Sequence, residues 1–283
     1  MKLIRFGESG KEKPGVLLDE VMYDASAFGE DYTEQFFETD GLNRLRLFAD
    51  TNKKSLTKLD SNVRLGSPIA RPSKIVCIGL NYEDHARETN ATPPSEPVVF
   101  LKSTTALCGP NDNIIIPKNS VKTDWEVELA IVIEKKARYL KEDEAMNYVA
   151  GYCLHNDISE REFQLERNGT WDKGKGCDTF APLGPWLITK DEIEDVNNLK
   201  LWLKVNGQIK QNGNTKNFIF KIPFLISYIS QFMTLLPGDI ISTGTPAGVG
   251  LGMKPPQYLK EGDIVELGID GLGTSRQQLI NYS

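Results

Sequence analysis

The sequence predicts a β-rich α+β protein with a small N-terminal α/β domain. Of its 283 residues, 40% are hydrophobic and 25% are charged, which is ordinary for globular domains. Beyond residue 70, short β-branched runs follow one another between Gly, Pro, Asn and Asp residues, without the alternating helices that repeating βαβ units need. Two prolines in the stretch 66–72 indicate a linker. We therefore expect one domain at residues 1–70 and a larger one at residues 71–283.

The smaller domain opens with two short apolar runs, at residues 2–6 and 16–18. They flank a turn-rich segment, which predicts a hairpin. Apolar residues then recur between Tyr32 and Phe48 at a spacing that predicts one or two short helices.

The larger domain is predicted to contain seven strands and one clear helix. From Pro223, apolar residues recur every four positions as far as Leu236, and Pro237 and Gly238 then end the helix. We expect its aromatic stripe to pack in the core. The strands are predicted at 75–78, 98–101, 114–116, 127–133, 199–205, 240–242 and 264–267.

Composition excludes several classes of partner. A net charge of −6 does not favour nucleic acid, which calls for a basic face. The chain has no uncharged apolar run long enough to span a bilayer and no apolar segment after its first residues that would suggest a signal peptide. Its four cysteines form no CxxC pair, which argues against a zinc knuckle and favours a reducing compartment. We expect a soluble, cytoplasmic protein without nucleic-acid or membrane partners.

Two carboxylates precede a strand that is predicted to be buried on both faces. Alternation places Glu126 and Glu128 on the same side of the chain, and the run that follows is continuously apolar as far as Ile133. Such a pair repels unless positive charge lies between its members, and hard divalent cations accept these oxygen ligands. Taken alone, the segment fits a solvent-exposed polar strand face at least as well.

A second group of polar residues begins at Asp157. If Ser159 caps the following helix, Asp157 is free to be a third carboxylate ligand. Arg161 and Gln164 are three residues apart and would share a helix face, able to present a guanidinium and an amide to one ligand. An ordinary helix cap with surface charges explains the same residues.

A third group follows the strand predicted at 75–78. His85 and Glu88 are three residues apart on what could be one helical turn, close enough for the carboxylate to orient the imidazole as a general base. Because the chain has two histidines, a histidine base is either His85 or His155. A surface His–Glu pair is the alternative. The run 83–96 is compatible with a loop that closes over substrate.

Two glycine-rich segments complete the candidates. Lys175, within 174–178, could place an ammonium group against an anion in a tight loop. The segment 244–250 lacks the features of a Walker or dinucleotide-binding loop, but it can offer backbone N–H groups and the Thr245 hydroxyl to a carboxylate.

Six segments together resemble the fumarylacetoacetate hydrolase superfamily, in the order that this superfamily has them. The resemblance covers residues 72–280 and extends weakly over the N-terminal domain. The segments are IGLNYEDHARE, FLKSTTALCGP, DWEVELAIVI, NDISEREFQ, GKGCDTFAPLGPW and GDIISTGTPAGVG.

The resemblance implies a mixed β-roll catalytic domain, a homodimer and a divalent metal, commonly Mg²⁺, with Mn²⁺ or Ca²⁺ also compatible. By position, the resemblance makes Glu126, Glu128 and Asp157 the metal ligands. It makes His85 and Glu88 the dyad that activates water, and it places Lys175 in the active-site loop. The residues that match substrate-contacting positions are Arg161, Gln164, Thr245 and Lys102.

The implied reaction is hydrolysis of the C3–C4 bond of a 2,4-dioxo acid, with water attacking C4 and the enolate of pyruvate leaving. The whole chain looks most similar to bacterial sugar-acid members that convert 2,4-diketo-3-deoxy-L-fuconate, or the related rhamnonate, to pyruvate and L-lactate. Alternatives are hydrolysis of fumarylpyruvate or fumarylacetoacetate, decarboxylation of oxaloacetate, and an inert protein that binds metal or sugar acid.

Overall fold

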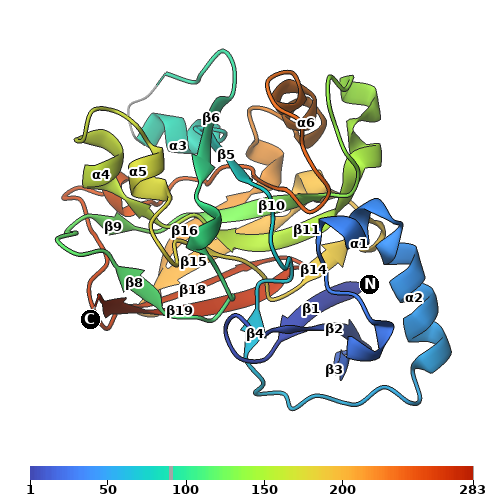
Figure 1. The fold of residues 1–283 in the computed structure, drawn as a ribbon. Helices are drawn as coiled ribbons and strands as arrows, with labels where there is room; N and C mark the ends of the chain where they lie inside the picture. The colour runs from blue at the N-terminus through green and yellow to red at the C-terminus, as the bar shows by residue number, and fades with distance from the viewer. Residues whose placement is uncertain (89–91, 283) are drawn as a thin grey trace.

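The computed structural model describes residues 1–88 and 92–282, and two β-sheets form its centre (Figure 1). Within these residues the larger sheet has ten strands. Nine follow the order β3 (Val21–Asp24), β2 (Lys13–Leu18), β1 (Lys2–Phe6), β14 (Leu187–Thr189), β11 (Val149–Asn156), β10 (Val127–Ile133), β17 (Ile240–Ser242), β5 (Ile75–Gly79) and β6 (Val98–Lys102), and β4 (Leu65–Gly66) pairs with β1.

The second sheet packs against the first through β10 and β11. Its strands follow the order β16 (Gln208–Asn214), β15 (Lys200–Val205), β18 (Ile264–Ile269), β19 (Gly273–Asn281) and β8 (Ile114–Ile116). Two small ladders join β9 (Thr123–Asp124) to β12 (Ser159–Glu160) and β7 (Leu107–Cys108) to β13 (Ala181–Pro182). Antiparallel pairs dominate, but β17 and β5, β8 and β19, and β7 and β13 are parallel, so the sheets are mixed as expected.

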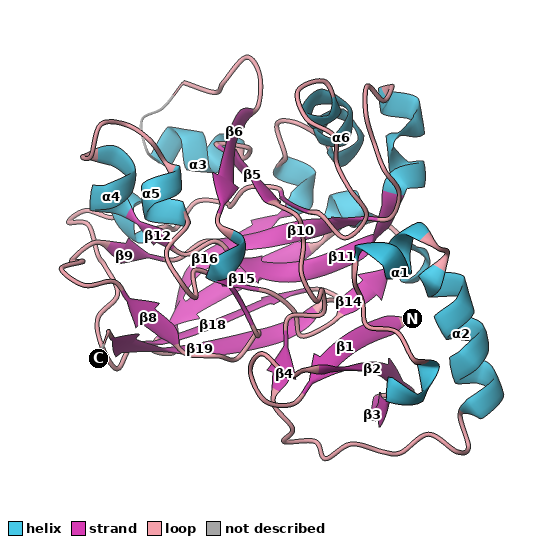
Figure 2. Ribbon diagram, viewed as in Figure 1, coloured by secondary structure: helices cyan, strands magenta, loops and turns pink. Residues whose placement is uncertain are grey.

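The α-helices lie outside the sheets (Figure 2). They are α1 (Glu34–Glu38), α2 (Gly41–Asn52), α3 (Glu83–Glu88), α4 (Arg161–Leu165), α5 (Asp172–Lys175) and α6 (Ile222–Ser230). Of these, α3, α4 and α5 gather at one end of the molecule, at the upper left of Figure 1. None of the helices in the described ranges is long and apolar enough to cross a membrane.

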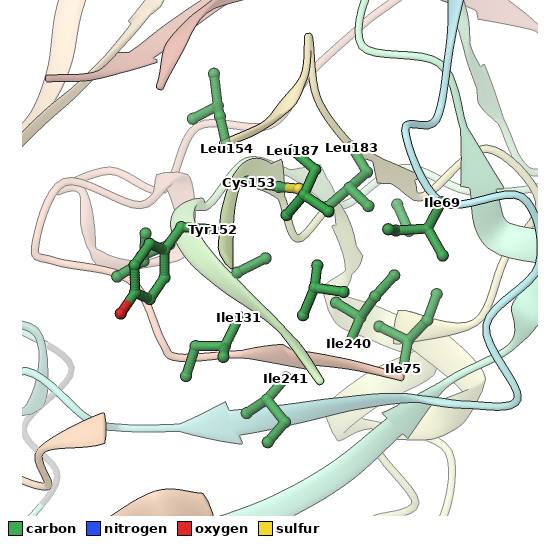
Figure 3. Packing of buried hydrophobic residues seen from close by; sticks show 14 of the residues in the cluster. Ile69, Ile75, Ile131, Tyr152, Cys153, Leu154, Leu183, Leu187, Ile240 and Ile241 are labelled. Atoms are coloured by element: carbon green, nitrogen blue, oxygen red, sulfur yellow. The ribbon is translucent and has the colours of Figure 1, made fainter. Parts of the chain in front are cut away.

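The core lies where β10 and β11 pair. Every residue of β10 is buried, which confirms the expectation of a strand covered on both faces. Ile131 pairs with Tyr152 on one side and with Ile241 on the other, and Figure 3 shows these side chains among the apolar groups of the neighbouring strands. These pairings on both sides fix the position of β10 within the sheet.

The N-terminal strands extend the larger sheet. The predicted hairpin is present as β1 and β2, and β1 also pairs with β14 from the second half of the chain. In the predicted linker, Ser67 is 6% exposed and Ile69 is fully buried, so this segment packs against the protein. The division at residue 70 stays a prediction.

The helix predicted from Pro223 to Leu236 is shorter than expected, because α6 ends at Ser230. Leu235 instead exchanges two backbone hydrogen bonds of 2.9 Å with Ala137, which draws the chain out of the helix. The aromatic stripe is not core packing either, since Phe232 is 66% exposed and stacks edge-on against Tyr228 at the surface. The core face of α6 consists of Ile222, Leu225, Ile226 and Ile229.

Candidate metal centre and active site

Three carboxylates meet where β10 begins and β11 ends. The antiparallel register pairs Glu128 with His155 and Val127 with Asn156, so Glu126 and Asp157 lie next to each other just beyond the paired residues. The Asp157 amide donates to the Glu126 carbonyl at 2.9 Å. Oxygen atoms of Glu126, Glu128 and Asp157 all lie within 4.8 Å of one another, and all three residues are buried.

Two of the three carboxylates are held by cations. Lys175 Nζ lies 2.7 Å from Glu126 Oε2 and 2.8 Å from Asp157 Oδ2. Arg161 Nη2 donates to Glu126 Oε1 at 2.7 Å, and Lys102 donates to Asp157 Oδ1. Burial by itself would raise the pKa of both carboxyls, but these cations outweigh it and hold each pKa below its usual range.

Glu128 is in a different environment. Its carboxylate accepts hydrogen bonds from the Ser242 hydroxyl and, at 3.0 Å, from the Gly244 amide, and no cation of the described residues forms an ion pair with it. Burial, followed by the charges of Asp157 and Glu126, raises its pKa well above the usual range. A divalent cation would supply the positive charge that Glu128 lacks, and three carboxylates are the hard oxygen donors that Mg²⁺ and Mn²⁺ accept. The donor set therefore fits such an ion.

The His85 and Glu88 pair lies on α3, as the spacing predicts. His85 Nδ1 is 3.6 Å from Glu88 Oε2. The Gly248 amide donates to both oxygens of Glu88, at 3.0 and 2.9 Å, and so fixes that carboxylate. Burial would raise the pKa of Glu88, but its contacts with His85 and Gly248 lower it overall, so the carboxylate is ionised and can orient the imidazole.

His155, the second histidine, is buried in the core. Its Nδ1 lies 2.6 Å from the Ser242 hydroxyl, and burial lowers its pKa to about 3. It is therefore a neutral residue of the core, which positions Ser242 and through it Glu128.

Arg161 and Gln164 share a helix face as expected, but the helix is capped differently. The side chain of Glu160, and not that of Ser159, accepts from the Phe163 amide at the start of α4. Arg161 Nη1 donates to Gln164 Oε1 at 3.0 Å, and Arg161 Nε donates to Asp124 at 2.8 Å.

The Thr245 hydroxyl is engaged by the protein itself. It donates to the Val127 carbonyl at 2.9 Å and accepts from Gln211 Nε2 at 2.8 Å. Thr245 therefore connects the start of β10 to Gln211, and its hydroxyl proton is already used in the hydrogen bond to Val127.

These residues surround a cavity of about 240 Å³. Seven of the ten predicted site residues line it, namely His85, Glu126, Glu128, Arg161, Gln164, Lys175 and Thr245. The other three each contact a lining residue or its partner: Glu88 meets His85, Asp157 meets Lys175, and Lys102 meets Asp157. The expected lid at 83–96 falls partly on residues 89–91, which lie outside the described residues.

Residues 74–280 match the model of the fumarylacetoacetate (FAA) hydrolase C-terminal domain, about three-quarters of the chain. The chain belongs to the fumarylacetoacetate hydrolase family. A protein of Burkholderia multivorans that carries only the provisional name hydrolase is 52% identical over 279 residues, which is 98% of each chain.

Solved structures of the family share the whole fold. Maleylpyruvate hydrolase from Sphingobium sp. SYK-6, in complex with manganese(II) and pyruvate, has a TM-score of 0.83 and 29% identity, with complete coverage of both chains. A 2-hydroxyhepta-2,4-diene-1,7-dioate isomerase from Mycobacterium marinum has a TM-score of 0.76 and 31% identity, covering 100% of this chain and 99% of that one. These likenesses support an enzyme of hydrolase or isomerase type.

Sequence reasoning missed three residues that position the site in this family member. Asp124 holds Arg161 and accepts from the Gly250 amide at 2.7 Å. Gln211 donates to Thr245, and Ser242 connects His155 to Glu128. Asp124 and Ser242 lie inside segments that the sequence singled out, so they could have been found there, whereas Gln211 comes from a distant strand without a local signal.

Proposed function

We propose that this protein is a metal-dependent hydrolase that cleaves the C3–C4 bond of a 2,4-dioxo acid and releases pyruvate. The observation that carries the proposal is the convergence of three groups on one cavity: the carboxylates of Glu126, Glu128 and Asp157, the His85–Glu88 pair and the Lys175 ammonium. Maleylpyruvate hydrolase, a structural neighbour, was crystallised with manganese(II) and pyruvate.

Glu126, Glu128 and Asp157 would hold the divalent cation, Mg²⁺ or Mn²⁺. When bound, such a cation acts as a Lewis acid that polarises a carbonyl oxygen and stabilises negative charge on it. Burial of the three carboxylates keeps bulk water away from this end of the cavity, where electrostatic interactions are consequently stronger than in water.

His85 is the general base in this proposal. Glu88, fixed by the Gly248 amide, orients the imidazole, which takes a proton from water as the water oxygen bonds to C4 of the substrate. The C3–C4 bond then breaks, and its electron pair becomes the enolate of pyruvate. The acyl half leaves as a carboxylic acid that contains the water oxygen, and a proton added to C3 completes pyruvate.

Lys175 supplies positive charge where the enolate forms. Burial would lower its pKa, but Asp157 and Glu126 raise the pKa overall, so the ammonium stays protonated. A cation that is in place before charge develops costs no reorganisation during the reaction, and removing one such donor typically lowers kcat by about 10²–10³-fold.

The acyl group is a separate question from the reaction. The sequence led us to expect a deoxy-sugar diketo acid, and fumarylpyruvate and oxaloacetate are the other candidates. A homodimer and a cytoplasmic location remain predictions from the resemblance and the composition.

Release of pyruvate tests the proposal. The purified protein is assayed with acetylpyruvate, fumarylpyruvate, 2,4-diketo-3-deoxy-L-fuconate and oxaloacetate, with Mn²⁺ and with EDTA. EDTA-sensitive pyruvate release from a 2,4-dioxo acid supports hydrolysis. Release from oxaloacetate alone, with CO₂, would make the protein a decarboxylase.

A further inference from the structure

The cavity that holds the proposed active site is lined by two chemically different sets of side chains. Its polar side chains belong to the residues already described, around the three carboxylates. The remaining lining is hydrocarbon, apart from the indole nitrogen of Trp171 and backbone atoms, and consists of Ile78, Gly79, Leu80, Phe100, Leu165, Trp171 and Leu251.

Phe100 lies close to members of both sets. Lys175 Nζ lies 5.0 Å from the centroid of the Phe100 ring, and the Trp171 ring lies 5.3 Å from the same centroid. Lys175 belongs to the polar set, and Trp171 belongs to the apolar set. Lys175 is the last residue of α5 and Trp171 directly precedes this helix. The Lys175 amide donates to the Trp171 carbonyl at 3.1 Å.

The position of the Trp171 ring depends on Gly79. A Cβ atom added to Gly79 would lie 2.6 Å from the Trp171 ring, so only glycine allows the indole to pack over the end of β5. The helix behind it is tied to β6, since the Leu101 amide donates to Asp172 at 2.8 Å. The position of the Trp171 ring is therefore determined by Gly79, by Phe100 and by the hydrogen bond that anchors the start of α5.

The permanent cations that line the cavity, among the described residues, are Arg161 and Lys175. Arg161 is bonded to Asp124, Glu126 and Gln164, and Lys175 to Glu126 and Asp157. Neither is left to pair with a second carboxylate at the acyl end. Burying an unpaired carboxylate, or a chain of hydroxyls without partners, is unfavourable, whereas an apolar group gains from leaving water.

We propose that Trp171 is the residue that selects the acyl group, and that the substrate is a 2,4-dioxo acid whose acyl end is uncharged and apolar. This inference rests on the proposed function. It does not favour the sugar acid expected from whole-chain likeness, because the apolar lining, as far as the described residues go, offers no side chain that would hold several hydroxyl groups.

A matched pair of substrates tests the selection. Crotonylpyruvate and fumarylpyruvate differ by a methyl group in place of the terminal carboxylate. We expect kcat/KM of the Mn²⁺-loaded enzyme to be at least about tenfold higher for crotonylpyruvate. Equal values, or a preference for fumarylpyruvate or the deoxy-sugar acid, would overturn the proposal.

Two substitutions connect the preference to Trp171. Trp171→Ala should bring the crotonyl-to-fumaryl ratio close to one, and Trp171→Phe, which keeps an apolar ring, should retain most of it. A purely structural role would lower both rates together and leave the ratio unchanged, which would contradict the assignment. Phe232→Ala removes an exposed ring that does not line the cavity, and it should leave the ratio as in the wild type.

Binding separates this inference from the proposed reaction. If no 2,4-dioxo acid is cleaved, the proposed function fails, and calorimetry with 2-oxohexanoate and 2-oxoadipate decides about the cavity. These compounds also differ by a methyl group in place of a carboxylate. Tighter binding of 2-oxohexanoate to the wild type, with the difference lost in Trp171→Ala, supports the apolar acyl end, and equal or tighter binding of 2-oxoadipate refutes it.

Discussion

Glu128 differs from the other two carboxylates in its partners, and this difference has a measurable consequence. Its neighbours are a hydroxyl, a backbone amide and two further carboxylates, whereas Glu126 and Asp157 are held by lysine and arginine. A carboxyl with a raised pKa binds its proton more tightly in the folded protein than in the unfolded chain. Stability is therefore lost as the pH rises from the ordinary pKa of glutamate towards the folded one.

Glu128→Gln should remove this loss. In EDTA, the melting temperature of the wild type should fall relative to the variant between pH 5 and pH 8, by roughly 2–4 °C for each kcal/mol of stability lost. The variant should also lose the increase in melting temperature that Mn²⁺ gives the wild type. A constant difference between the two proteins across this pH range would show that Glu128 is not the group responsible.

His85→Ala should separate catalysis from metal binding. His85 is outside the carboxylate trio, so Mn²⁺ affinity by calorimetry should stay within about threefold of the wild type, while kcat should fall by about 10²–10⁴-fold as expected for loss of a general base. Arg87→Ala, an exposed change on the same helical turn, is the control and should retain full activity. If His85→Ala loses the metal, the role assigned to His85 is wrong.

At the scale of elements, local patterns predicted the buried strands well and the ends of helices poorly. A strand with the predicted limits is present as β10, and its continuous apolar run from Leu129 to Ile133 reflects burial on both faces. The end of α6 is set by a bridge between Leu235 and Ala137, almost one hundred residues apart in the chain, which no local pattern records. The capping of α4 by Glu160 likewise involves a distant segment, because Ser159 and Glu160 pair with Asp124 and Thr123.

The two faces of α6 should respond differently to truncation. Ile229 is fully buried, and Ile229→Ala should lower the free energy of unfolding by about 2–5 kcal/mol. Phe232 is 66% exposed, so Phe232→Ala should cost less than about 1 kcal/mol. Urea denaturation of both variants measures these costs, and a larger cost for Phe232 would restore the original expectation that the aromatic stripe belongs to the core.

At the scale of the whole molecule, the sequence indicated the site more completely than it indicated how the domains join. The ten predicted site residues come from distant segments, and the fold gathers them because β10, β11 and β17 are adjacent in one sheet. The family resemblance made this possible, since spacing alone left each segment ambiguous. The pairing of β1 with β14 could not be predicted, because short strands of similar composition are compatible with many partners.

This pairing predicts that residues 71–283 do not fold stably alone. Removing the first seventy residues would expose the edge of β14 and remove the Arg64–Asp112 ion pair, together with apolar contacts of Leu3 and Leu45. The truncated protein should aggregate or melt without a cooperative transition, as judged by calorimetry beside the full chain. A cooperative transition close to that of the full chain would establish the division at residue 70 as a true domain boundary.

The central claim is that water, activated at His85, adds to C4 of a 2,4-dioxo acid. A single turnover of acetylpyruvate in H₂¹⁸O, analysed by mass spectrometry, tests it most directly. We predict one ¹⁸O atom in the released acetate, with an equal amount of pyruvate, and no products when EDTA is present. Pyruvate accompanied by CO₂, or a rearranged substrate without label, would contradict hydrolysis of the C3–C4 bond.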